Sequence, residues 1–309
     1  MPYARFAPVD RSARLDLAER RWTAMLEAKP DLGSAVALQR TLLGLVIDLA
    51  AQFEGGVRLP RLTLPPRYLT TKLASGIPAL AGEPIQIPVD TLRPTLLGLV
   101  RALAEGGGGE ATLAIRAAID EGRVDIAVLL TLALRREQGA LRAFATKAGL
   151  GHDLLWLVLD LAAGPFAHAL LHALFDQVPA GSPLHDAFDR WSRGYCPLCG
   201  SWPVLVEDLQ GTRRLRCSFC AAGWDVISTG CLYCGESGDR FSIVTPDPSQ
   251  PRRVIEACAA CHGYTKVVAT ETSLPFPLLA LADLESMDLD IAAMQHGLAR
   301  PAIKTFARR

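Results

Sequence analysis

All eight cysteines of the chain lie between residues 196 and 261, and each belongs to a Cys-x-x-Cys pair. Two thiolates separated by two residues lie on one tight turn, so both can bind the same metal ion, and two such turns complete a tetrahedron. Four pairs therefore predict two metal sites. The candidate ligands are Cys196, Cys199, Cys217, Cys220, Cys231, Cys234, Cys258 and Cys261.

The four pairs repeat one layout. Each half opens with Cys-x-x-Cys-Gly, continues through a β-type run (204–206 or 241–244) and a turn, and returns to the second cysteine pair. Gly200 and Gly235 suit the positive φ that such a turn requires. The layout predicts a tandem pair of zinc-ribbon or rubredoxin-like modules whose consecutive pairs share a site. An interleaved arrangement, with the first turn facing the third, stays open because sequence does not fix connectivity.

Other cysteine chemistries explain the pattern less well. Disulfides would indicate a secreted chain, yet the first residues do not resemble a charged segment followed by an apolar leader. A thiol–disulfide enzyme would place each pair between a strand and a helix, which the flanking glycines and β-type runs do not support. Metal ligation is the interpretation we adopt, and four thiolates suit zinc and a single iron equally.

Composition limits the partners. The 309-residue chain has a net charge of zero and half of its residues are hydrophobic, so it predicts more than one domain and a large core. Residues 191–275 contain as many acidic as basic residues, eight of each. This balance argues against nucleic acid and an anionic membrane as partners. A zinc-ribbon adaptor for nucleic acid or transcription remains the alternative functional class, because ribbon folds commonly bind nucleic acid.

The chain before the cysteines shows the spacing of helices. Apolar residues recur at helical period in segments before residue 190, and few β-type runs interrupt them. The expected helices cover residues 12–27, 33–53, 91–103, 110–119, 124–135, 141–148 and 152–175. The last is apolar but contains Asp160, Pro165 and two histidines, which predicts a buried core helix, kinked or broken before Pro165, rather than a membrane span. We therefore expect no membrane insertion and a cytoplasmic location.

The predicted fold class is α+β, with an all-α N-terminal domain, two tandem rubredoxin-like or zinc-ribbon-like modules and a C-terminal helical tail. The expected boundaries are residues 1–190 for the helical domain, 191–228 and 229–274 for the two modules, and 275–309 for the tail.

Two other motifs have ordinary structural interpretations. His168 and His172 would share a helix face, but no glutamate follows His168 as a zincin motif requires, so we interpret them as core histidines. Four glycines at 106–109 follow no strand and precede no phosphate-binding lysine, so they predict a flexible link.

With these motifs in place, the final third of the chain resembles the formate dehydrogenase accessory protein family, FdhE. The resemblance rests on CPLCGSWPV, the strand from Arg214 to Cys220, Trp224, CLYCG, CAACHGYTK and ADLESMDLDIAAMQHGLARPAI. One departure is Ser228 and Thr229, where members of the family often carry a basic residue.

The resemblance implies a cytoplasmic accessory protein for the maturation of respiratory, molybdenum-dependent formate dehydrogenases. It implies association with their catalytic subunit before export and two rubredoxin-type iron sites on the eight cysteines, with zinc as the alternative metal. It implies no catalytic residue, so we expect no enzyme, although a redox role for iron stays open. Oligomeric state is not predicted. Candidates for the partner surface are Arg213 to Arg216, Tyr264, Lys266 and Arg300.

Overall fold

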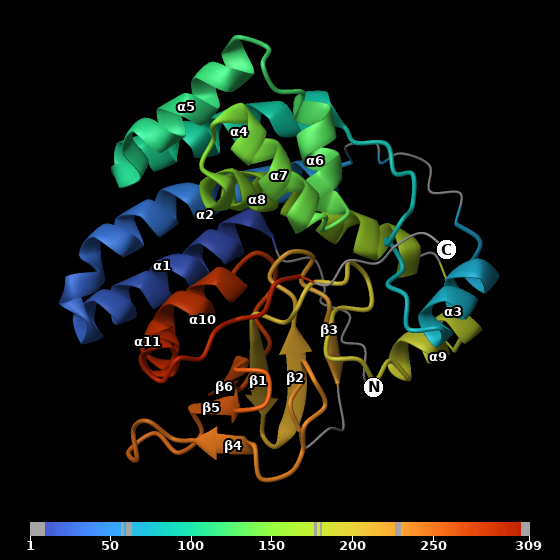
Figure 1. Ribbon diagram of the computed structural model, residues 1–309, viewed down its shortest axis with the longest axis vertical. Helices are drawn as coiled ribbons and strands as arrows, with labels where there is room; N and C mark the ends of the chain where they lie inside the picture. The colour runs from blue at the N-terminus through green and yellow to red at the C-terminus, as the bar shows by residue number, and fades with distance from the viewer. Residues whose placement is uncertain are drawn as a thin grey trace. The chain divides into compact units, whose positions relative to one another are not determined.

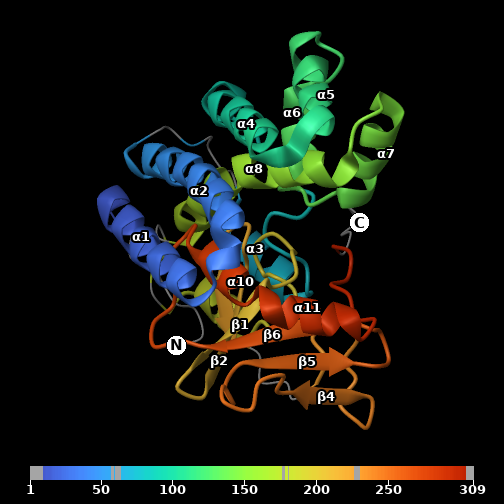
Figure 2. The same ribbon diagram turned by 90° about the vertical axis from the view of Figure 1, so that its left-hand side faces the viewer.

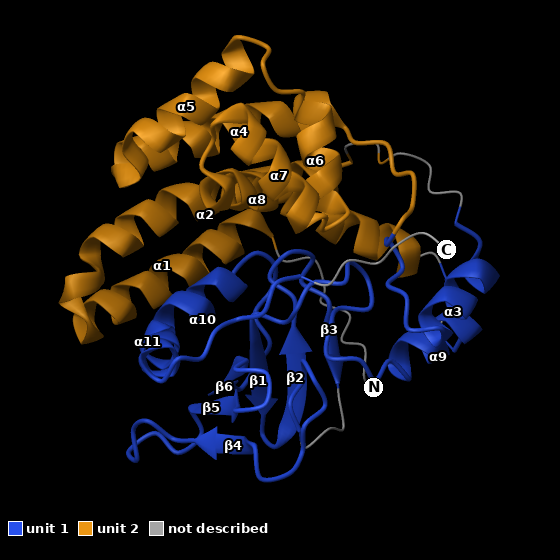
Figure 3. Ribbon diagram, in the orientation of Figure 1, with its two compact units in different colours: residues 1–6, 64–81, 178–306 blue, residues 7–63, 82–177, 307–309 orange. Residues whose placement is uncertain are grey.

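The computed structural model describes residues 10–56, 59, 64–175, 178–179, 181–225 and 230–303. It divides into two compact units (Figure 3). Unit 1 contains the described residues of 64–81 and 178–306, and unit 2 those of 7–63 and 82–177. The predicted α+β class is confirmed, with a helical N-terminal region, a sheet that carries the cysteines and C-terminal helices.

The secondary-structure elements among the described residues of unit 2 are all helices. The Asp10 carboxylate accepts the Ser12 N–H and caps the first helix, and Asp125 caps α6 in the same way. The helices are α1 (Arg11–Ala28), η1 (Pro30–Leu32), α2 (Gly33–Glu54), α4 (Val89–Leu103), η2 (Ala104–Gly108), α5 (Gly109–Asp120), α6 (Ile126–Leu134), α7 (Gln138–Ala148) and α8 (His152–Phe175). Each helix predicted from periodicity is therefore present.

Two local details of unit 2 differ from expectation. Helix α8 runs without a break across Pro165, with most of its residues buried. The four glycines, expected to form a flexible link, lie in a π-helical turn, η2, and in the first residue of α5. Gly107 has φ 109° inside this turn, a value that glycine adopts without strain.

Within the part of the chain that the structure describes, two helices are long and apolar enough to cross a bilayer, judged by length and composition alone. They are Pro30–Glu54, with 33% of its apolar window buried, and His152–Phe175, with 72% buried. The burial of the second helix fits the core of a folded unit.

Unit 1 is built on one six-stranded sheet (Figures 1 and 2). Its strands are β1 (Leu205–Leu209), β2 (Thr212–Arg216), β3 (Gly223–Asp225), β4 (Phe241–Val244), β5 (Val254–Cys258) and β6 (Tyr264–Ala269). The order is β3-β2-β1-β6-β5-β4. Each module contributes three antiparallel strands, and parallel pairing of β1 with β6 joins the two halves, with Val206 opposite Val267. The two predicted modules therefore share one sheet.

The C-terminal helices of unit 1 are α10 (Leu279–Glu285) and α11 (Met287–Gln295), as the sequence predicted. Helix α11 lies against β5 and β6 (Figure 2). Leu289 and Ala293 of this helix pack with Ile255 and Tyr264 in one buried cluster. This packing covers the second module on one face of the sheet.

Unit 1 also takes up residues that the sequence analysis placed in the helical domain 1–190. Two short helices, α3 (Pro66–Ala74) and α9 (Pro183–Asp189), pack on each other within it. Neither was predicted, although each begins with proline at its first position, a common start signal. The backbone N–H groups of Ala79 and Leu80 donate to the carbonyls of Pro197 and Leu198, which anchors this segment on the first cysteine turn.

Candidate metal centres

The four Cys-x-x-Cys turns, here called knuckles, share one backbone design. The knuckles are residues 196–200, 217–221, 231–235 and 258–262. In each, the N–H of the leading cysteine donates to the carbonyl five residues later, at 2.7–3.0 Å. Gly200, Ala221 and Gly235 donate back to that cysteine's carbonyl. The repeated hydrogen bonds hold the paired sulfurs on the same side of each turn.

The fifth residue of every knuckle has positive φ. The values are 84° at Gly200, 59° at Ala221, 81° at Gly235 and 56° at His262. Glycine at two of these positions was predicted from the sequence. Ala221 and His262 adopt the same conformation at a steric cost, since a Cβ crowds the backbone there. His262 is exposed on the fourth knuckle.

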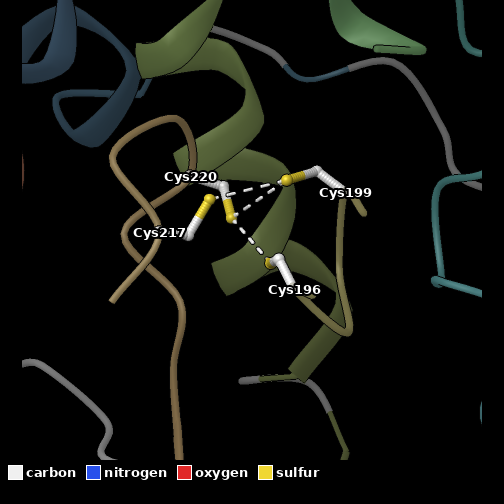
Figure 4. A group of neighbouring side chains, drawn as sticks. All are labelled: Cys196, Cys199, Cys217 and Cys220. Atoms are coloured by element: carbon white, nitrogen blue, oxygen red, sulfur yellow. Dashed lines mark hydrogen bonds between the residues drawn. The ribbon is translucent and has the colours of Figure 1, made fainter. Parts of the chain in front are cut away.

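The first site brings together Cys196, Cys199, Cys217 and Cys220, whose sulfurs point toward one another (Figure 4). The Cys196–Cys220 and Cys199–Cys217 sulfur distances are 3.5 and 3.6 Å, and Cys199–Cys220 is 3.8 Å. A tetrahedron with metal–sulfur bonds of about 2.3 Å has edges of about 3.8 Å. The thiols therefore fit a tetrahedral metal ion without rearrangement.

The second site brings together Cys231, Cys234, Cys258 and Cys261. The sulfurs of Cys231 and Cys261 are 3.6 Å apart, as are those of Cys234 and Cys258. In both sites the thiols come from consecutive pairs, so the structure has the contiguous arrangement and not the interleaved one. Every cysteine named from the sequence lies in one of the two sites.

The two sites differ in burial. All four cysteines of the first site are buried, whereas Cys234 and Cys261 of the second are exposed. Burial raises the pKa of the Cys196 and Cys220 thiols well above its usual value. At the second site burial raises the pKa of Cys231 to about 12. Burial opposes ionisation of Cys258 too, but N–H groups of Cys261 and Ala260 outweigh it and leave its pKa lowered. A bound cation would stabilise the thiolates that burial disfavours.

Most residues proposed for a partner surface are buried or paired with other residues of unit 1. Arg216, Tyr264 and Lys266 are buried, so they cannot form such a surface. Lys266 donates to Asp283 and Asp290 at 2.6 Å, and the Tyr264 hydroxyl donates to Asp290. The sequence analysis did not predict the burial of these side chains, because a charged residue near a knuckle is usually exposed to solvent.

The remaining candidates also have partners within unit 1. Arg213 pairs with Glu256, Arg214 with Asp225, and Arg300 with Asp283 and Asp290. Of these three arginines, Arg300 is the exposed one. Ser228 and Thr229, the departure from the family pattern, lie outside the described residues.

The histidines of α8 interact with each other, with Nε2 atoms 3.3 Å apart. His168 is buried, in agreement with its interpretation as a core residue. Among the described residues, clusters of three or more potential ligands occur only at the two cysteine sites.

Sequence reasoning missed a group of aromatic residues beside the knuckles. The ring centroids of Tyr195 and Trp202 are 5.8 Å apart, and those of Trp202 and Tyr233 are 4.9 Å apart. Tyr195 precedes Cys196 and Tyr233 precedes Cys234. The sequence does show an aromatic residue immediately before a cysteine in both modules. It does not show which of these rings are in contact.

Comparison with known proteins places these centres in context. No family model matches the chain. It is 31% identical over 156 residues to the protein FdhE homolog of Haemophilus ducreyi, covering 49% of this chain and 47% of the relative. It is 35% identical over 118 residues to protein FdhE of Escherichia coli K12, covering 37% of this chain and 38% of the relative. The matches thus span less than half the length of these relatives.

A solved structure extends the likeness to the whole fold. The crystal structure of the FdhE protein from Pseudomonas aeruginosa superposes with a TM-score of 0.60 and 23% identity, covering 98% of this chain and 97% of that one. The chain is similar to FdhE proteins in sequence over part of its length and in fold over nearly all of it. The resemblance noted from the cysteine motifs is thereby confirmed, and the FdhE-like fold includes the helical region where the sequence carried no specific motif.

Proposed function

We propose that this FdhE-like chain is an accessory protein for the maturation of a respiratory, molybdenum-dependent formate dehydrogenase. In this role it binds the catalytic subunit in the cytoplasm before export, without inserting in the membrane and without catalysing a reaction of its own. The observation that carries the proposal is the pair of four-cysteine sites in a chain whose matched relatives are named FdhE.

The eight cysteines named above are the proposed metal ligands. The tetrahedral spacing of their sulfurs supports this role at both sites. The family implies iron held as in rubredoxin, and zinc is the alternative, since both ions accept four thiolates. Bound iron would supply one-electron redox chemistry and zinc only rigidity. The protein contributes a fixed backbone at each knuckle.

The contacts within unit 1 argue against the alternative, a nucleic-acid or transcription adaptor. Arg213, Arg214 and Arg216 form the most basic stretch of the sheet, yet each pairs with a carboxylate of the same unit. Phosphate binding would require these cations to exchange partners.

The test is an anaerobic pull-down of the tagged chain from its own host, with partners identified by mass spectrometry and bound metal by elemental analysis. A parallel form carries Cys231→Ser and Cys234→Ser, and Ser237→Ala on the same exposed loop is the matched control. We expect a formate dehydrogenase catalytic subunit with the native chain and the control, and its loss with the cysteine variant. Recovery of RNA polymerase or nucleic acid in its place would overturn the proposal.

Elemental analysis of the same samples decides the metal. Iron with a visible thiolate charge-transfer band supports the rubredoxin-type assignment. Zinc alone at both sites would contradict it and leave a structural role for the metal.

A further inference from the structure

The backbone just before the first knuckle meets the third knuckle at Gly194 and Leu232. Gly194 lies two residues before Cys196, and Leu232 follows Cys231. A Cβ at Gly194 would lie 2.1 Å from the Leu232 carbonyl oxygen and 2.8 Å from its carbon. Both distances are below any normal contact, so only glycine lets the third knuckle lie this close to the approach to the first.

The aromatic residues make a second contact between the sites. Trp202, which follows the first knuckle, meets the ring of Tyr233 in the third at an interplanar angle of 84°. The Tyr233 hydroxyl donates to the Tyr264 carbonyl at 2.8 Å, so this ring is fixed from both ends. Edge-to-face ring pairs of this kind add stability beyond the area they bury.

A third contact comes from the segment after α11. The N–H of Ala299 donates to the His262 carbonyl in the fourth knuckle, at 2.9 Å. Three residues later the Ala302 carbonyl accepts from the Trp202 indole, also at 2.9 Å. One short segment thus connects the second site to the residue beside the first.

The surroundings of the two sites are unequal. The first site is buried, and backbone bonds from Ala79 and Leu80 anchor its first knuckle. In the second site Cys234 and Cys261 are exposed, and β4 lies at the edge of the sheet. The third knuckle therefore depends strongly on its contacts with Gly194 and Trp202.

We propose that Gly194 and Trp202, neither of them a metal ligand, are positioning residues that couple metal binding at the second site to the first. The inference rests on the proposed binding of metal to both sites. Metal at the first site fixes the surface on which the third knuckle forms, so the ion at the second site binds more tightly when the first is filled. The coupling is reciprocal in free energy, so metal at either site tightens binding at the other.

The test is a titration of the metal-free full chain with Cd(II), followed by ¹¹³Cd NMR and by chelator competition. The Cys231→Ser, Cys234→Ser variant assigns the two resonances. In the native chain we expect positive cooperativity, with little of the form that holds a single ion. In Gly194→Ala we expect the affinity of the second site to fall about tenfold or more while the first resonance keeps its chemical shift.

Controls separate positioning from general destabilisation. Gly139→Ala, where an added Cβ meets nothing within 4 Å, should leave both sites unchanged. Trp202→Leu should reproduce the loss at the second site and Trp202→Phe should restore much of it, because the ring contact returns. If Gly194→Ala fails to fold, the two Trp202 variants still test the coupling between the sites.

Three outcomes overturn the inference. Independent binding at the two sites of the native chain would remove the coupling and leave the metal sites in place. If Gly194→Ala and Trp202→Leu weaken binding of the first ion as much as binding of the second, the cooperativity is unchanged and the two residues have a structural role only. A native chain that takes up no Cd(II) through thiolates would overturn metal binding itself, and the inference with it.

Discussion

Arg216 and Glu207 form a buried ion pair on neighbouring strands of the first module, with Nη1 and Oε1 2.6 Å apart. Their side chains are 0% and 2% exposed. Arg216 also donates to the Leu274 carbonyl, and Glu207 accepts from the Ser273 hydroxyl and the Leu274 N–H. The ion pair thereby holds the segment that leads from the sheet to α10 against the strand that delivers the second cysteine pair.

Arg216→Met should destabilise unit 1 strongly. It leaves the Glu207 carboxylate buried without its cation, a loss of about 3–5 kcal/mol for pairs of this kind. The measurement is chemical denaturation of the metal-loaded chain, followed by tryptophan fluorescence. Arg252→Ala breaks an ion pair with Asp208 whose arginine is 53% exposed, and should cost less than about 1 kcal/mol. Equal losses in the two variants would contradict the argument from burial.

The positive φ of the knuckles predicts opposite effects of two substitutions. Gly235→Ala meets no atom within 4 Å but forces alanine to φ 81°, and should cost about 1 kcal/mol. His262→Gly relieves a residue held at φ 56° and should stabilise the metal-loaded chain by up to about 1 kcal/mol. The melting temperatures of the two metal-loaded variants, compared with the native chain, test these opposite predictions. A lower melting temperature for His262→Gly would show that its imidazole makes a contact worth more than the strain.

The carboxylate cluster beside the second module predicts an acid-sensitive interaction. Burial alone would raise the pKa of Asp283, but the charges of Arg300 and Lys266 outweigh it and hold that pKa below the usual value. A depressed pKa in the folded state contributes stability that is present above the unfolded value, about 3.9, and is lost as the pH falls through the folded value. Asp283→Asn should therefore lower the melting temperature at pH 6, and the gap from native should close below about pH 4.

This difference is measured by melting both proteins between pH 6 and pH 2.5. Both carry the same eight thiols, so subtraction removes the contribution of metal release. Asp120→Asn, in an exposed pair with Arg116, is the control and should show little difference at any pH. A gap that stays constant through acid would show that the Asp283 charge does not contribute.

The histidine pair of α8 should not affect metal content. His168→Ala with His172→Ala removes both Nε2 atoms, so the chain should melt at a lower temperature because a cavity forms around buried His168. Elemental analysis should find as many metal ions per chain as in the native protein. A loss of metal would contradict the assignment of these histidines to the core. His152→Ala, at the partly exposed start of the same helix, is the matched control.

Local chemistry was readable from the sequence. The spacing of the cysteines predicted four turns, and glycine at residues 200 and 235 predicted the backbone conformation that the structure has. Periodicity predicted the helices of unit 2, the strand Phe241–Val244 and the two C-terminal helices. Each of these features depends on residues a few positions apart, so the sequence contains the information directly.

Only the tertiary structure decided how these pieces meet. Parallel pairing of β1 with β6 merges the two modules, and the closeness of Gly194 to Leu232 brings the third knuckle against the segment before the first. The same folding buried Arg216, Tyr264 and Lys266, which the sequence analysis had placed on a surface. Glu207 binds Ser273 and Lys266 binds Asp290, partners that lie tens of residues away in the chain. Charge and hydropathy do not reveal such partners, because strand order and burial determine which residues pair.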